Sequence, residues 1–459
     1  MKNKRITNAA TVALILCNVG LFSLIWLKFY NNFAFRSHRE EGAIGAIIAY
    51  YVIYRWLSKL YRGYAIASTG IDETVLSQFI SFSISDLALY IACCLLRRNY
   101  VNILPGAGIV AAQLVGTMII VWMAKRCLLS HIEPDRTLLI YGGKENEESA
   151  GRFADRLQSK YGHLFDVCCM EGEDQEPRKL YGEIAQCERV IFFGVSSNNR
   201  ARYMERCLDE GKVFLFVPEF EDILCRSCSV KNFLDTPLMR YDYSYKRNRN
   251  YVLKRAFDIV LSLLFLIVFS PIMLIVAVSI KLEDRGPIFY RQERVTQHGR
   301  KFSIFKFRSM VVDAEKYGAQ PATANDPRIT RVGRIIRKTR IDETPQVLNV
   351  LLGQMSLVGP RPESSMLVQL YEKEVPEFRY RHRVKGGLTG YAQVYGKYNT
   401  SPEDKLKLDM LYIENQSFLL DFKLILLTIK TMFQPESTEG FDKARSDEIY
   451  NRTRRKKAG

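Results

Sequence analysis

Long apolar stretches in the first quarter of the chain constrain its fold more than any other sequence feature. They cover residues 9–30, 43–61, 76–96 and 101–124, with few interior charges. Each approaches the ~20 residues with which an α-helix crosses a bilayer. Lys2, Lys4 and Arg5 precede the first stretch as in a signal peptide, but no small-residue cleavage site follows it. We therefore expect four transmembrane helices within residues 1–130, the first being an uncleaved anchor.

Lysine and arginine lie on both sides of these stretches, so the positive-inside rule orients the bundle only moderately. If the N-terminus lies inside, an even number of spans returns the chain to the cytoplasmic side. We expect everything after about residue 126 to be cytoplasmic on this topology.

Residues 133–240 alternate strand-like and helix-like runs, beginning with RTLLIYGG and ending with VFLFVPEF. This alternation is typical of a parallel, doubly wound sheet, so residues 131–243 predict a Rossmann-like α/β domain. Gly142 and Gly143 stand at the first strand-to-helix turn, but the G-x-G-x-x-G fingerprint and its acidic partner are not evident. We favour a nucleotide-free structural or regulatory domain over a dinucleotide site.

The cysteine spacing argues against a zinc site, whereas the net charge is compatible with several classes of ligand. All ten cysteines lie at or before Cys228, and the Cys225/Cys228 pair has no second pair at zinc-ligand spacing after it. The net charge of +17 would suit nucleic acid, anionic lipid or phosphorylated substrates. The basic segment at 244–255 runs directly into an apolar one. We therefore expect this segment to contact membrane lipids and not nucleic acid.

That apolar segment, residues 256–280, has basic residues on both flanks, whereas a spanning helix usually shows a one-sided excess. Ser270-Pro271 lies in its middle: the proline removes a helical hydrogen bond, and a serine hydroxyl can satisfy the freed carbonyl. We expect a bent, re-entrant helix that enters the membrane and returns. An ordinary kinked fifth span is the alternative, since proline is tolerated in spanning helices.

The strongest chemical signal follows this helix. Residues 251–385 carry 23 Lys/Arg against 13 Asp/Glu, a field that suits phosphate ligands. Within it, Asp342 and Glu343 are adjacent carboxylates just after a run of basic residues, fit to bind a metal or attack phosphorus. Asp342 could equally be the N-cap of a helix with Pro345 in its first turn, and spacing does not separate the two roles. Arg361, fixed between two prolines, suits a bidentate phosphate contact.

Taken together, these motifs resemble those of the bacterial sugar transferase family, the monotopic polyprenyl-phosphate phosphoglycosyl transferases. The resemblance covers about Lys254 to Phe433. It rests on KRAFDIVLSLL, Ser270-Pro271, GPIFYRQERV, FKFRSM, DETPQVLNVLLGQMSLVGPRPE, GLTGYAQVYG and LDMLYIENQSFLLDFKLILLTIK. With the regions before it, the chain resembles the large subclass of that family. The resemblance thus implies a helical membrane bundle, a Rossmann-like domain, and an α-rich catalytic domain over 244–459.

The resemblance implies a phosphotransferase that moves a sugar 1-phosphate from a UDP-sugar to polyprenyl (undecaprenyl) phosphate and releases UMP. It implies Asp342 as the nucleophile, through a covalent phosphosugar, and Glu343 as the residue associated with Mg²⁺, the expected cofactor. Arg361 is carried over as a phosphate contact. The expected location is the bacterial inner membrane, with the catalytic domain on the cytoplasmic face.

Further substrate-binding residues are carried over from the same motifs: Arg337, Lys306, Arg308, Asp409 and Asp421. For Asp409 and Asp421, catalysis and helix packing both stay open. The chain departs from the family at Lys385-Gly386-Gly387 and at Thr344. The N-terminal half could serve as an anchor, a homodimer interface or a contact for a partner. The rival readings are a nucleotide-sugar dehydratase or epimerase and a non-enzymatic membrane scaffold.

Overall fold

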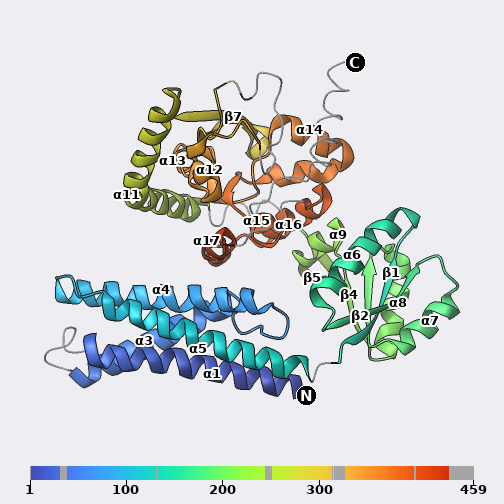
Figure 1. The fold of residues 1–459 in the computed structure, drawn as a ribbon. Helices are drawn as coiled ribbons and strands as arrows, with labels where there is room; N and C mark the ends of the chain where they lie inside the picture. The colour runs from blue at the N-terminus through green and yellow to red at the C-terminus, as the bar shows by residue number, and fades with distance from the viewer. Residues whose placement is uncertain are drawn as a thin grey trace. The chain divides into compact units, whose positions relative to one another are not determined.

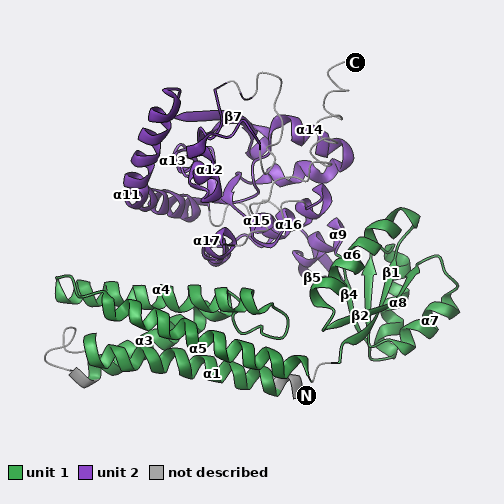
Figure 2. Ribbon diagram, viewed as in Figure 1, with its two compact units in different colours: residues 1–217 green, residues 218–459 purple. Residues whose placement is uncertain are grey.

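The computed structural model describes residues 2–30, 39–130, 133–242, 251–312, 314, 326–396 and 400–433. The chain divides into two compact units, Met1–Val217 and Pro218–Gly459 (Figure 2). Each unit is described by itself below.

The first unit begins with a helical bundle. Its helices are α1 (Lys2–Ile25), which continues as a π-helical turn over Trp26–Tyr30, α3 (Arg39–Leu60), α4 (Ile71–Arg97) and α5 (Leu104–Leu129). Helices α1 and α4 each pack against both α3 and α5, which closes the bundle. Inside it, Asn18 Nδ2 donates to Tyr54 Oη at 3.0 Å, and Gln113 Nε2 donates to Tyr50 Oη at 2.7 Å. Polar groups that bridge helices are typical of membrane bundles.

Four helices in the described part of the chain are long and apolar enough to cross a membrane: Arg5–Tyr30, α4, α5 and α11 (Tyr251–Asp284). Helix α3 forms where the second apolar stretch predicts a helix, but it is not one of these four. Its tyrosines and the charges of Arg55 and Lys59 make it less apolar. A crossing by α3 therefore stays a prediction.

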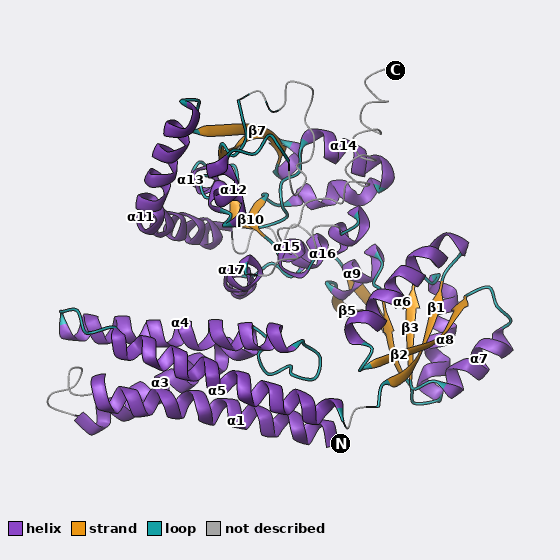
Figure 3. Cartoon of the chain, viewed as in Figure 1, coloured by secondary structure: helices purple, strands orange, loops and turns teal. Residues whose placement is uncertain are grey.

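The first unit also contains a parallel four-stranded sheet, as the alternation of strands and helices predicts (Figure 3). Its order is β2-β1-β3-β4, from β1 (Asp135–Tyr141), β2 (Phe165–Gly172), β3 (Arg189–Phe193) and β4 (Val213–Phe216). Apolar residues on α6 (Glu147–Tyr161) cluster with Leu139 and Ile191. Those on α7 (Pro177–Gln186) and α8 (Ser197–Asp209) cluster with the alternate residues Leu138 and Val190. Because neighbouring residues on a strand face opposite ways, the helices cover both faces.

The first strand-to-helix turn is closely packed on its own chain. A Cβ atom on Gly142 would lie 2.0 Å from the carbonyl oxygen of Gly194, and Asn146 Nδ2 donates to the Gly142 carbonyl at 2.6 Å. Glycine is therefore needed here for close approach of two backbones. This contact gives Gly142 a structural reason that needs no nucleotide.

The second unit combines α9 (Phe220–Arg226), α11, two hairpins, a parallel pair of strands and a group of shorter helices (Figure 1). The hairpins are β5 (Ser229–Phe233) with β6 (Thr236–Arg240), and β7 (Phe289–Val295) with β8 (Lys301–Phe307). The parallel pair is β9 (Ser356–Val358) with β10 (Gly387–Thr389). The later helices are α14 (Ser365–Glu374), the 3-10 segment η5 (Pro376–Arg383), α15 (Tyr391–Tyr395), α16 (Pro402–Glu414) and α17 (Phe418–Met432).

One core joins α9, β8, β9 and the later helices. Ile223 on α9 clusters there with Phe378, Met410 and Leu424, all of them almost fully buried. Phe220 stacks on Tyr380 at 5.3 Å between ring centroids. Helix α9 therefore packs with the second unit, although it precedes the residue, 244, at which we expect the catalytic domain to begin. The predicted domain limits remain predictions.

Helix α11 is continuous over 34 residues, with Pro271 inside it. A proline at this position cannot donate to the carbonyl of Ile267, and Ser270 Oγ donates to that carbonyl at 3.1 Å. Figure 1 shows the helix as two arms that meet at a bend. The predicted compensation of the proline by its neighbouring serine is thus present in the structure.

Candidate active site

The adjacent carboxylates lie in a short link between two helices. Helix α12 (Arg331–Lys338) is capped by Thr330, whose hydroxyl accepts from Gly333 N at 2.9 Å. After α12, Arg340 adopts a left-handed backbone with φ 55°, and a 3-10 turn over Ile341–Glu343 follows. A non-glycine residue in this region is strained, and such strain often marks functional sites.

Helix α13 (Gln346–Leu351) begins only after this link; Pro345 is its N-cap residue, and no side chain caps it by a hydrogen bond. Asp342 therefore does not act as the helix cap that its spacing allowed. Of the two roles that the sequence left open for Asp342, the capping role is absent from the structure.

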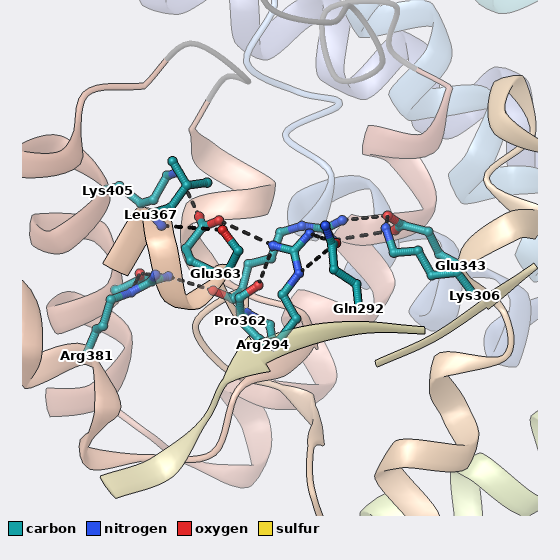
Figure 4. A network of polar contacts seen from close by, with 12 residues as sticks. Gln292, Arg294, Lys306, Glu343, Pro362, Glu363, Leu367, Arg381 and Lys405 are labelled. Atoms are coloured by element: carbon teal, nitrogen blue, oxygen red, sulfur yellow. Dashed lines mark hydrogen bonds and ion pairs between the residues drawn. The ribbon is translucent and has the colours of Figure 1, made fainter. Parts of the chain in front are cut away.

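Glu343 is held between two cations. Its Oε1 accepts from Arg361 Nη2 at 2.5 Å and from Lys306 Nζ at 3.3 Å, and its Oε2 accepts from Arg361 Nη1 at 3.5 Å. Lys306 reaches it from strand β8 (Figure 4), and Arg361 follows β9 in the chain. The two-pronged contact with Arg361 is the geometry for which guanidinium groups are suited.

The two carboxyl groups have opposite pKa shifts. Burial opposes the ionisation of Glu343, but the charges of Arg361 and Lys306 outweigh it and hold the pKa of Glu343 well below its usual range. Burial, followed by the charge of Glu343, raises the pKa of Asp342 to about 6, although Lys306, Arg337 and Arg361 partly offset the rise. Adjacent carboxyl groups with separated pKa values can take different roles in one reaction.

Arg337 and Arg308 occupy different surroundings. Arg337, in the last turn of α12, lowers the pKa of Asp342 by its charge and so belongs to the electrostatic environment of the pair. Arg308 is buried at the end of β8 and pairs with Asp284, the last residue of α11. A Cβ atom on Gly286 would lie 1.8 Å from Arg308 Nη1, so this guanidinium fills the space beneath the helix end.

Asp409 and Asp421 are both buried in ion pairs with cations of the chain itself. Asp409 lies 2.7 Å from Arg381 Nη2, with both side chains 1% exposed. Asp421 lies 2.6 Å from Lys254 Nζ and accepts from Tyr412 Oη at 2.8 Å. Groups of the chain itself thus occupy both oxygens of Asp421 and Oδ2 of Asp409, while the buried Asp409 Oδ1 has no hydrogen-bond partner among the described residues.

The donor atoms at the pair fit one mode of Mg²⁺ binding. Among the described residues, no group of three or more His, Cys, Asp and Glu side chains is placed to hold a metal ion. Mg²⁺ is commonly bound through one or two carboxylates together with phosphate oxygens and water. Asp342 and Glu343 supply such carboxylates, so the remaining ligands would come from a bound phosphate group and water.

Sequence reasoning did not single out several charged residues behind the pair. Arg294 on β7 donates to Gln292 Oε1 and to the Pro362 carbonyl, while Glu363 pairs with Lys405 at 3.0 Å (Figure 4). Arg381 lies in η5, inside the basic run RYRHRVK. No periodicity in that run distinguishes a buried arginine from a solvated one. Glu363 is part of the PRPE motif, which was the one available signal.

Comparisons with known proteins identify the family of this chain. The model of the bacterial sugar transferase family matches residues 249–435. The exopolysaccharide production protein PSS of Rhizobium leguminosarum bv. phaseoli is 42% identical over 165 residues, which cover 82% of that protein and 34% of this chain. The chain belongs to the bacterial sugar transferase family.

Two further relatives of this chain have names that specify the sugar and the lipid acceptor. The UDP-N-acetylgalactosamine-undecaprenyl-phosphate N-acetylgalactosaminephosphotransferase of Aeromonas hydrophila is 48% identical over 159 residues, 34% of this chain. The UDP-glucose:undecaprenyl-phosphate glucose-1-phosphate transferase of Xanthomonas campestris pv. campestris is 45% identical over 159 residues, 33% of this chain. The matches span 38% and 33% of these two relatives, respectively.

Proposed function

We propose that this sugar transferase moves a sugar 1-phosphate from a UDP-sugar to undecaprenyl phosphate and releases UMP, as the first step of a surface glycan such as an exopolysaccharide or capsule. The observation that carries the proposal is the carboxylate pair: Glu343 is neutralised by Lys306 and Arg361, while Asp342 beside it has a raised pKa. A more basic carboxylate in a cationic site suits attack on an anionic phosphate group.

The proposed chemistry has two displacements at one phosphorus. A carboxylate oxygen of Asp342 bonds to the β-phosphorus of the UDP-sugar, and the bond from that phosphorus to the bridging oxygen breaks. UMP leaves with the bridging oxygen and its electron pair. An oxygen of undecaprenyl phosphate then bonds to the same phosphorus, which frees the Asp342 carboxylate and yields the polyprenyl diphosphate sugar.

The cationic residues around the carboxylate pair suit the binding of the anionic phosphate groups on which this chemistry acts. Arg361 and Lys306 offset the charge of Glu343 and of incoming phosphate oxygens, and Arg337 adds positive charge beside Asp342. Mg²⁺ held by Glu343 and Asp342 would supply further neutralisation of the phosphate charge.

We place the active site at the cytoplasmic face of the inner membrane, with α11 entering the bilayer and returning. Both ends of α11 support this because both contact the same compact unit. Near its start, Arg255 donates to the carbonyls of Val350 and Leu351. Near its end, Glu283 accepts from Arg331 N at 2.8 Å. A straight helix of this length would separate those ends by about 50 Å.

The topology has a direct test. Single cysteines placed near residues 250 and 290 in a Cys-free background should both react with an impermeant thiol reagent only from the cytoplasmic side. Reaction of the second site from outside would show a spanning helix instead.

The reaction is tested by isotope exchange between labelled UMP and a panel of UDP-sugars, including UDP-glucose and UDP-N-acetylgalactosamine. A covalent intermediate makes exchange occur without the lipid acceptor, whereas a scaffold or a dehydratase would give none. The UDP-sugar that supports the fastest exchange identifies the donor. Purified, folded protein that shows no exchange with any donor would count against the proposal.

A further inference from the structure

The turn that carries Arg361 is held by three cations, of which Arg381 is buried and Lys254 and Arg294 are partly buried. Lys254 Nζ donates to the carbonyl of Val358 at 3.1 Å, Arg381 Nη2 to that of Arg361 at 2.9 Å, and Arg294 Nη1 to that of Pro362 at 3.2 Å. The intervening carbonyl of Pro360 accepts from a backbone N–H at 2.9 Å. The backbone from 358 to 362 is thus fixed at successive points.

Each of these cations also pairs with a carboxylate. Lys254 pairs with Asp421 at 2.6 Å and Arg381 with Asp409 at 2.7 Å. Arg294 lies 3.8 Å from Glu363, whose other partner is Lys405 (Figure 4). The arrangement repeats three times on one turn: a carboxylate orients a cation, and the cation holds a carbonyl.

Arg381 is the member that bears most directly on Arg361. It is 2% exposed, its Nε and Nη2 both point to Asp409 Oδ2, and its guanidinium lies 4.7 Å from the centre of the Phe378 ring. It binds the carbonyl of Arg361 itself, while the Arg361 side chain extends to Glu343. Arg381 therefore holds the backbone of the residue whose side chain contacts Glu343.

Stability alone does not account for a fully buried ion pair in this place. Apolar residues of similar volume commonly replace buried pairs with no loss of stability, whereas removal of one partner is costly. What an apolar pair could not supply is a donor to the Arg361 carbonyl. A displacement of about 1 Å at a catalytic group can reduce turnover by roughly two orders of magnitude.

We propose that Arg381 is a positioning residue for Arg361, and that Asp409 serves the reaction by orienting Arg381. The inference rests on the proposed function, and it assigns Asp409 to the support of the phosphate-binding turn. Substrate contact by Asp409 is not required.

The test compares the double substitution Arg381→Met/Asp409→Leu with the unsubstituted full-length enzyme. The apolar pair keeps the core filled but removes the donor to the Arg361 carbonyl. We expect kcat to fall about 100-fold while the Tm stays close to that of the unsubstituted enzyme. The acid limb of the kcat/KM profile should move to higher pH, because Arg361 is one of the charges that lower the pKa of Asp342.

Two further variants make the result decisive. Met410→Ala creates a cavity in the same core, next to Asp409 in sequence, and should lower the Tm without moving the acid limb. Arg381→Lys keeps a charge opposite Asp409, but its single amine cannot reproduce the guanidinium contacts. It should therefore shift the acid limb in the same direction as the double variant, and it carries the test if the double variant does not fold.

An unchanged kcat and pH profile in the double variant, or in Arg381→Lys, would overturn the positioning role. So would a loss that Met410→Ala reproduces at equal stability with no shift of the acid limb. These failures differ from failure of the proposed function, in which the unsubstituted enzyme itself would release no UMP from any UDP-sugar.

Discussion

The sheet region and the carboxylate pair both bring acidic side chains to hydrogen-bond donors, but with a different balance of charge. At the start of α8, Glu173 Oε2 accepts from Ser196 N at 3.0 Å, Ser196 Oγ at 2.7 Å and Asn199 Nδ2 at 3.0 Å. The helix N-terminus, a common phosphate site, is there satisfied by the chain's own carboxylate. Around Glu343, by contrast, two full cations share one carboxylate.

In the sheet region the hydrogen-bond donors are satisfied by the chain itself, whereas the charges around Glu343 suit a charged ligand. Neutral donors matched by one internal acceptor leave little reason to bind a phosphate group. Where cations outnumber carboxylates, positive charge is left over to bind a phosphate group. The following predictions test the distinction.

The largest expected effect is on Asp342. Asp342→Asn preserves the shape of the side chain but removes the nucleophile, so turnover should fall by at least about 1,000-fold with the fold intact. UMP release and circular dichroism of the purified variant measure the two properties. Near-normal turnover in well-folded protein would contradict a covalent mechanism.

Glu343→Gln should have the next largest effect. The amide keeps one oxygen acceptor, but it removes the negative charge that Lys306 and Arg361 share and one of the oxygens that we propose to bind Mg²⁺. We expect turnover about 100-fold lower and a higher Mg²⁺ concentration for half-maximal activity. An unchanged Mg²⁺ titration would argue against a metal role for Glu343.

Two truncations compare the units. Deletion of residues 1–217 removes the bundle and the parallel sheet but keeps α9 with its core, so membrane association and some transferase activity should remain. Deletion of residues 1–240 also removes Ile223 and the Phe220–Tyr380 stack, and should lower stability by about 2–4 kcal/mol further. Thermal denaturation and UMP release of both proteins measure the difference; equal behaviour would place α9 outside the catalytic core.

The raised pKa of Asp342 predicts how activity and stability respond to pH. Activity should be lost as the pH falls through about 6, because the nucleophile becomes protonated. The free energy of unfolding changes in the opposite direction and falls as the pH rises. The folded chain holds this proton more tightly than the unfolded chain, so ionisation of Asp342 costs on the order of 3 kcal/mol of stability above pH 6.

Asp342→Asn should therefore raise the Tm at pH 8, and this gain should disappear below about pH 4, near the pKa of an unfolded aspartate. Differential scanning fluorimetry across this range checks the sign. A lower Tm for the variant at pH 8 would contradict it.

The smallest effect on turnover is expected at Glu173. Glu173→Gln keeps one oxygen acceptor for the donors of Ser196 and Asn199, so kcat should stay within about twofold and the sheet region should lose about 1 kcal/mol. Activity and urea denaturation measure these values. A large loss of turnover would show that the sheet region contributes to catalysis.

The sequence predicted the features that depend on local pattern. The four parallel strands lie where apolar runs alternate with helical ones, and Ser270 satisfies the carbonyl freed by Pro271. Membership in the sugar transferase family also followed from the motifs.

Features that depend on long-range pairing were not accessible in this way. Asp409 and Arg381 are 28 residues apart, and Asp421 and Lys254 are 167 apart. Nothing in the sequence near either aspartate indicates a buried cation partner. Packing also placed α9 in the second unit, because its apolar face meets residues that lie far along the chain.

The position of α9 has a consequence for synthesis of the protein. Ile223 leaves the ribosome about 200 residues before Leu424, with which it shares a core. Helix α11 is made between them. The apolar face of α9 therefore stays exposed while α11 is synthesised and enters the membrane. The newly made chain is prone to aggregation during this interval. Conditions that slow elongation after residue 226 should for that reason increase its dependence on chaperones.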